Sequence, residues 1–199
     1  MSDFSFQTWE SEHPESWFSC IPGKNGFLPV GDPLDTLPTE YSKLNDLLND
    51  MKIHQTDGKK GYLEIGDLQN KVMEELPMYD VSEIEDKQLL AALQRDFCFL
   101  ASAYSLEPCH IALMKSENND YGTARSILPP RISIPLLELA KKNDTFPWLD
   151  YAYGYGLNNA VLKTGLDPTD YRSYETVRTF NGNESEKGFI NVHVAMVAQ

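Results

Sequence analysis

The sequence predicts a mainly α-helical fold. Apolar residues recur at three- and four-residue spacing in several separate stretches, which is the periodicity of one helix face. Prolines and glycines fall between these stretches, while strand-like runs are few and short. With 199 residues, 41% of them hydrophobic, the chain can bury one large core, or a complete domain plus part of another.

Residues 1–39 predict an extended arm, because five prolines and three glycines disfavour long regular elements there. We expect this arm to pack across a folded body, since it is rich in aromatic side chains. These are Phe4, Phe6, Trp9, Trp17, Phe18 and Phe27.

Two amphipathic helices are predicted next. Thr39 is the candidate N-cap of the first, whose apolar stripe is Leu44, Leu47, Leu48 and Met51. Residues 54–61 form a polar loop. The second helix carries the stripe Ile65, Leu68, Val72 and Leu76 and ends before Pro77.

A long central helix is predicted from Asp86, its N-cap, to Tyr104. Its apolar face is broad enough to organise the first core, and Cys98 is expected to be a small buried residue in it. Residues 116–125 predict a surface excursion. The proline-rich residues 127–135 predict a rigid extended connector and a candidate boundary between two lobes.

The C-terminal part predicts three further helices. They are a short one at 136–142, one after Pro147 that is closed by Gly165, and one from Phe189 onward. For the last segment a helix is favoured over a buried strand, with Ser185 as a candidate cap. Because residues 188–198 are apolar nearly all round, we expect them to be buried. Residues 176–180 predict a short strand.

Composition excludes several classes of partner. The 17 Lys and Arg against 30 Asp and Glu give a net charge of -13, which repels nucleic acid and anionic lipid. Apolar runs are too short to cross a bilayer and residues 1–12 carry no signal peptide, so we expect no membrane partner. Three cysteines without CxxC spacing favour the reducing cytoplasm.

Few residues stand out as candidates for chemistry. Phosphate-binding glycine loops, zinc-protease motifs and serine-hydrolase motifs are absent, and the four histidines are not spaced as metal ligands. Cys109 beside His110 would form a nucleophilic pair only with a third orienting group. His193, among apolar residues, is either a structural core histidine, which periodicity alone favours, or part of a functional site. On a regular helix it shares a face with Phe189.

Tyr151 and Tyr155 share a face if their helix is regular, and they either line an aromatic pocket or serve as amphipathic packing residues. Gly154 and Gly156 permit close approach of a neighbouring element or a flat ligand.

Several segments, in this order, resemble the indoleamine 2,3-dioxygenase family, the most specific being residues 179–195, TFNGNESEKGFINVHVA. The others are GFLP at 26–29, LPTEY at 37–41, ELPMY at 75–79, LASAY at 100–104, LPPRISIP at 128–135 and YRSYE at 171–175. The resemblance runs from about Phe18 to the last residue and covers the N-terminal half of that family.

This resemblance implies a helical, cytosolic haem protein that inserts both atoms of dioxygen across the indole C2–C3 bond of tryptophan, giving N-formylkynurenine in tryptophan catabolism by the kynurenine pathway. Residues 1–146 would form the small lobe with its arm, and residues 147–199 the start of the haem-binding lobe. The cofactor would be haem b. Its iron ligand, and the arginine that pairs with the substrate carboxylate, lie beyond the equivalent of Gln199, so we expect a C-terminal half or a second polypeptide to supply them.

The resemblance also implies a substrate site on the distal side of the haem. Matched residue by residue, its positions are Tyr151, Gly154, Tyr155, Phe189, Ile190 and His193. Phe189 would pack against the indole ring, and His193 would bond the indole N–H without being an obligatory base. This chain departs from the family pattern at Tyr155, where an aliphatic residue is expected, and at Ile190, where an aromatic one is. These departures motivate a different indole as substrate.

Two functions therefore remain open from the sequence. The first is a haem-dependent dioxygenase for which this chain supplies the distal, substrate-binding side. The alternative is a non-catalytic protein on the same scaffold that binds haem or an aromatic ligand, or serves in an interaction.

Overall fold

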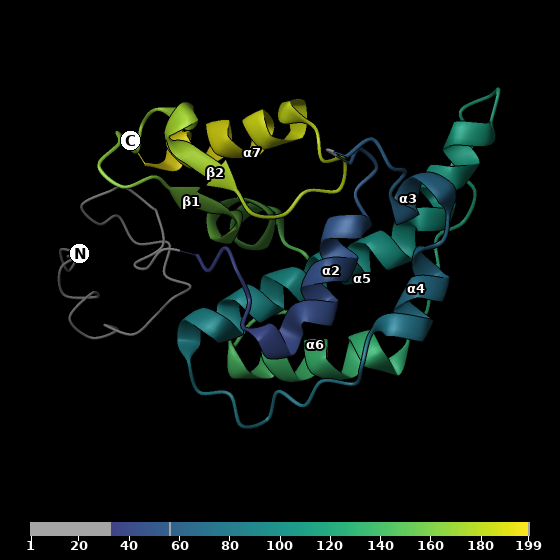
Figure 1. Ribbon diagram of the computed structural model, residues 1–199, viewed down its shortest axis with the longest axis horizontal. Coiled ribbons are helices and arrows are strands. Elements are labelled where there is room, and N and C mark those ends of the chain that lie inside the picture. The colour runs from purple at the N-terminus through teal and green to yellow at the C-terminus, as the bar shows by residue number, and fades with distance from the viewer. Residues whose placement is uncertain (1–32, 56, 199) are drawn as a thin grey trace, which may run out of the picture.

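The computed structural model describes residues 33–55 and 57–198, which form a mainly helical body and confirm the predicted fold class (Figure 1). Its helices are η1 (Thr39–Tyr41), α2 (Ser42–Asp50), α3 (Tyr62–Ile65), α4 (Leu68–Glu75), α5 (Lys87–Lys115), α6 (Pro130–Lys142), η2 (Tyr151–Gly156), η3 (Leu157–Asn159), η4 (Tyr171–Ser173) and α7 (Glu184–Val197). Its strands are β1 (Ala160–Leu162) and β2 (Tyr174–Thr176). The predictions about residues 1–32, including the arm's aromatic residues, His13 and Cys20, lie outside the described residues.

Helix α5 is the central element, with α2, α3, α4 and α6 packed around it (Figure 1). It begins as predicted, because the Asp86 carboxylate accepts a hydrogen bond from the Leu89 amide at 2.9 Å. It continues well past Tyr104, however, and contains Pro108. Proline cannot donate to the carbonyl four residues before it, and Arg125 replaces that donor by bonding the Tyr104 carbonyl. The predicted end at Tyr104 is therefore wrong.

Helix α6 contradicts the predicted connector at residues 127–135. Pro130 occupies the first turn, where a missing N–H costs nothing, and the helix continues through Pro135. Ile132, Leu136 and Leu139 are buried in the same core as the α5 residues. This packing outweighs the local cost of Pro135, so residues 127–135 lie within one packed body.

The structure contains the first two predicted helices, but their ends differ from the predicted ones. The predicted stripe on α2 is buried, but Thr39 is the first residue of η1 and makes no capping bond. The second helix is split into α3 and α4 by Gly66, whose φ of 74° is left-handed. Ile65 consequently turns out of the stripe and is 51% exposed.

The C-terminal part folds around an antiparallel pair of strands, in which Val161 lies opposite Glu175. The helix predicted to run to Gly165 ends instead at Asn159, whose side chain bonds the carbonyl and the amide of Arg178 at 2.8 and 2.7 Å. The predicted strand lies earlier than expected, at β2. Asn159 thus ends one element and joins it to the segment after β2.

Helix α7 lies across the two strands and confirms the predicted terminal helix (Figure 1). Its N-cap is Asn183, whose side chain accepts from the Glu186 amide, and not Ser185. Only one face is buried, through Ile190, Val194 and Ala195. The expectation that residues 188–198 are buried all round is wrong, because the opposite face has no neighbouring element among the described residues.

The core forms two clusters. The larger gathers buried residues between Leu37 and Leu139, and the smaller gathers residues between Leu157 and Ala195. The division of the chain at residue 146 stays a prediction. Helix α5 is long and apolar enough to cross a membrane by length and composition alone, but it buries Arg95, Asp96 and Glu107 against other elements, as the core helix of a helical bundle does.

Candidate functional site

An apolar groove of about 190 Å³ runs between η2 and α7, and we call it the aromatic groove. It is lined by Tyr151, Ala152, Tyr155, Gly156, Leu157, Phe189, Ile190, His193, Val194, Met196 and Val197. Of the six residues predicted from the resemblance, all except Gly154 line it. The resemblance therefore selected residues that are far apart in sequence and share one cavity.

The rings in the aromatic groove pack against one another. The ring of Tyr151 lies 5.6 Å from the His193 imidazole in an edge contact and 6.0 Å from the Tyr155 ring in a stacked one. Phe189 lies 4.5 Å from His193. These contacts confirm that Tyr151 and Tyr155 share a face, as do Phe189 and His193. Phe189 remains 49% exposed, so its side of the groove is open.

The helix η2 that carries the tyrosines is a π-helix, a form often found at functional sites. Asp150 caps it by accepting from the amides of Tyr153 and Gly154 at 2.6 and 3.1 Å. A side chain on Gly154 would come within 3.2 Å of the Asp150 carboxylate and of Leu149. Gly154 therefore serves close packing behind the groove instead of lining it.

His193 has a defined tautomer. Its Nδ1 lies 2.7 Å from the carbonyl oxygen of Phe189. A carbonyl can only accept, so Nδ1 carries the proton and, in the neutral ring, Nε2 keeps a free lone pair. The imidazole is half-buried, and its partner is a carbonyl of its own helix. His193 thus offers a hydrogen-bond acceptor in a groove that is otherwise almost entirely apolar.

Glu186 was missed by the sequence analysis. The hydroxyl of Tyr155 donates to its carboxylate at 3.2 Å. Burial, together with the negative charge of Glu186, raises the pKa of Tyr155 above its usual range. The signal that could have identified Glu186 is the pattern Asn183-x-x-Glu186, a variant of the capping box at the start of a helix.

A buried charge cluster of Arg95, Asp96 and Arg178 lies beneath the strands and was also missed. Asp96 accepts from Arg95 at 2.8 Å and from two nitrogens of Arg178 at 3.0 and 2.7 Å. Burial opposes ionisation, but the two guanidinium groups hold the pKa of Asp96 below its usual value. The sequence signal that could have identified this cluster is the charged pair Arg95-Asp96, which lies inside an apolar run.

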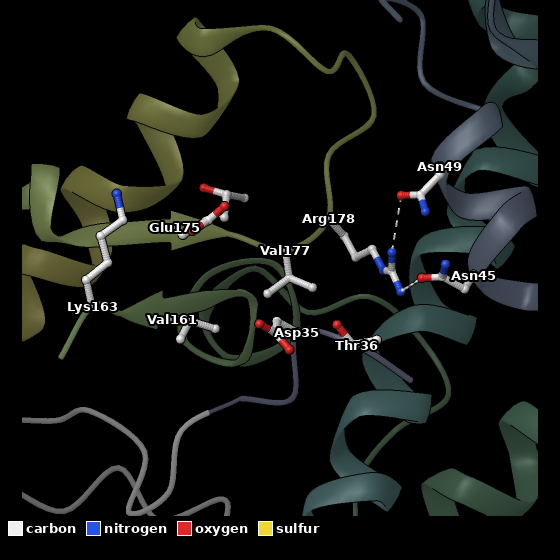
Figure 2. Close-up of a pocket in the computed structure, with 10 residues that line it drawn as sticks. Asp35, Thr36, Asn45, Asn49, Val161, Lys163, Glu175, Val177 and Arg178 are labelled. Carbon is white, nitrogen blue, oxygen red and sulfur yellow. Dashed lines mark hydrogen bonds between the residues drawn. The ribbon is translucent and has the colours of Figure 1, made fainter. Parts of the chain in front are cut away.

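A second cavity, of about 370 Å³, borders this cluster (Figure 2). Arg178 points to Asn45 and Asn49 of α2, while Lys163 lies at the opposite end of the cavity (Figure 2). Each of the three guanidinium nitrogens of Arg178 donates a hydrogen bond to a protein acceptor. Arg178 is therefore committed to Asp96, Asn45 and Asn49 and not to a ligand in this cavity.

The remaining candidates do not assemble into a site. Cys98 is buried, and burial raises the pKa of its thiol to about 12, as suits a small core residue. Cys109 is partly exposed, and no third group orients it and His110 within residues 33–55 and 57–198. Across the same residues, no three His, Cys, Asp or Glu side chains gather to hold a metal ion.

Comparison with known proteins adds one match. The sequence profile of a protein family described as indoleamine 2,3-dioxygenase matches residues 19–199, which is most of the chain. No curated protein matches the chain.

Proposed function

The chain belongs to the indoleamine 2,3-dioxygenase family, and from this premise we propose that it supplies the substrate-binding side of a haem-dependent dioxygenase. The reaction is cleavage of the indole C2–C3 bond of L-tryptophan, or of a related indole, to N-formylkynurenine. The observation that carries the proposal is the aromatic groove, which three aromatic rings line together with one imidazole acceptor. An indole ring needs such a surface, because it is apolar apart from a single N–H.

The family depends on haem, and the residues present fit one side of that group. A flat macrocycle is held mainly by apolar and aromatic side chains, which Tyr151, Phe189 and Met196 offer on the open side of the groove. Bound haem b would supply the activation of dioxygen. We propose that its iron ligand comes from a C-terminal half or a second polypeptide, since the imidazole of His193 is assigned to the substrate.

Each groove residue then has a physical role. Phe189 packs against the indole ring, and the Nε2 of His193 accepts the indole N–H, which fixes the orientation of the bond to be cleaved. Tyr151, Tyr155 and Ile190 give the groove its width. Gly154 lets η2 pack tightly against Asp150 and so keeps the two tyrosines in place.

Reconstitution tests this function. The full chain is mixed with haem and a C-terminal half from the same family, and tryptophan and indole are supplied with a reductant and dioxygen. We expect N-formylkynurenine from tryptophan, and a His193→Ala variant with weakened substrate binding. The matched control is His110→Ala, which changes a histidine outside the groove. Absence of turnover with every indole tested would contradict the proposal.

The second candidate is a protein that binds haem or an aromatic ligand without converting it. The observation that favours it is that residues of this chain alone supply both the aromatic walls of the groove and the acceptor of His193. An absorption spectrum of the purified chain with added haem separates the two: a Soret band without turnover supports the second function. For either function we propose a cytoplasmic location, supported by the free thiols of Cys98 and Cys109.

A further inference from the structure

The carboxylate of Glu186 joins three parts of the site. It accepts hydrogen bonds from the backbone amides of Phe180 and Asn181 at 2.9 and 2.6 Å, and from that of Gly182 at 3.3 Å. It also accepts the hydroxyl of Tyr155 at 3.2 Å. The loop before α7 and the tyrosine on η2 are therefore held by one side chain.

The ring of Tyr155 is also confined on its faces. Phe99 stacks on it at 5.7 Å, Phe180 at 6.3 Å and Tyr151 at 6.0 Å. Rotation of Tyr155 away from this position would remove the hydroxyl from its acceptor while the ring remained half-buried, which is costly. The contacts at its tip and on its faces thus select one orientation.

We propose that Glu186 is a positioning residue, which fixes the Tyr155 ring as one wall of the aromatic groove and thereby limits the size of the aromatic ligand that enters. The inference rests on the proposed function, because it assigns a selectivity to the same groove. Glu186 does not itself line the groove and sets this limit through the tyrosine that it holds.

Helix capping does not account for these contacts. A glutamate at this position of a capping box usually bonds back to the amide of the N-cap residue. Here Asn183 caps α7, while the Glu186 carboxylate reaches past it to residues 180–182 and to Tyr155. A purely structural Glu186 would change stability without changing ligand size selectivity.

The experiment compares Glu186→Gln, Tyr155→Phe and the double variant in the full chain. Both carboxylate oxygens of Glu186 accept a backbone amide, so the NH2 group of a glutamine, which can only donate, leaves at least one of these amides without its acceptor. The substitution also removes the negative charge that faces the Tyr155 hydroxyl. The probes are indole and 5-benzyloxyindole, which share the N–H and differ by an additional ring. Glu184→Gln is the matched control, because Glu184 is an exposed carboxylate in the same turn that pairs only with Lys187 among the contacts described.

We expect each single variant to improve the affinity for 5-benzyloxyindole relative to indole by about threefold or more, and the double variant to add nothing further. In spectra of tyrosine-labelled protein, the Tyr155 resonances should shift in Glu186→Gln and stay in place in Glu184→Gln. An unchanged affinity ratio in Glu186→Gln, or two effects that simply add, would overturn the inference.

Failure of the proposed function gives a different result. If neither probe binds to any form of the chain, the groove is not an indole site. The positioning role is then decided by the resonances alone: Tyr155 and the amides of residues 180–182 move in Glu186→Gln if it holds, and remain in place if it does not.

Discussion

The hydrogen bond from His193 to its own helix determines what this residue offers to a ligand. Because Nδ1–H is bonded to the Phe189 carbonyl, Nε2 is the nitrogen available to a partner, and in the neutral ring it can only accept. The Nε2 of a neutral His193 therefore favours an aromatic ligand that carries an N–H donor and disfavours one that presents an acceptor at the same place.

His193→Ala tests that acceptor. We expect the variant to lose about fivefold in affinity for indole, the value of roughly one hydrogen bond, and to bind 1-methylindole as the unchanged protein does. The methyl group removes the N–H, so the acceptor has nothing to bind. Calorimetry or ligand-observed NMR measures both affinities. An equal loss for the two ligands would show that His193 acts through packing alone.

Asp96 provides a residue-scale prediction about stability. Its folded-state pKa is below the unfolded value, so its contribution is present above about pH 4 and is lost as the pH falls through the folded value. We expect Asp96→Asn to lose about 3–5 kcal/mol of unfolding free energy at pH 7, because two buried guanidinium groups lose their counter-charge. Urea unfolding at a series of pH values should show this difference shrinking below about pH 4.

Glu117→Gln is the control for Asp96→Asn, since it removes an exposed carboxylate. It should change the unfolding free energy by less than about 0.5 kcal/mol. A loss in Asp96→Asn that grows as the pH falls would have the wrong sign and would contradict the assignment of a charged Asp96.

At the scale of elements, the start of α7 tests which residue is the cap. Asn183→Ala should destabilise the protein by about 1 kcal/mol, because the Glu186 amide loses its side-chain acceptor. Ser185→Ala, two residues later on the exposed side of the first turn, should have almost no effect. Thermal or urea unfolding of both variants decides between them, and the reverse order of effects would restore the assignment made from the sequence.

Several features that depend on local patterns were predicted, whereas features that depend on distant contacts were not. Asp86 and the apolar face after it predict the start of α5, but its continuation through Pro108 depends on Arg125, which lies beyond the end of the helix. The shared face of Phe189 and His193 follows from helical spacing. The contact of Tyr155 with Glu186 joins residues 31 positions apart, and no periodicity indicates it.

At the scale of the whole molecule, Tyr155 packs against both core clusters and so links them. Phe99 of α5 is fully buried and stacks on Tyr155, which lines the aromatic groove, and packs on Phe180, which precedes α7. The buried charge cluster makes a second connection, between Asp96 and Arg178. The groove is thus held on the larger core by aromatic contacts, by an ion pair and by backbone hydrogen bonds such as that from the His54 amide to the Asn181 carbonyl.

Phe99→Ala should therefore separate the stabilities of the two clusters. We expect a loss of about 3–5 kcal/mol in unfolding free energy. In hydrogen exchange, protection of the Val194 amide in α7 should fall more than that of the Leu93 amide in α5, because the smaller cluster loses its support. Leu139→Ala in α6 is the matched control, since it opens a cavity in the larger cluster away from the groove. There, loss of protection should be greatest in α5 and α6. If Phe99→Ala instead lowers protection equally at Val194 and Leu93, the two clusters unfold as one unit, and Phe99 is a residue of a common core.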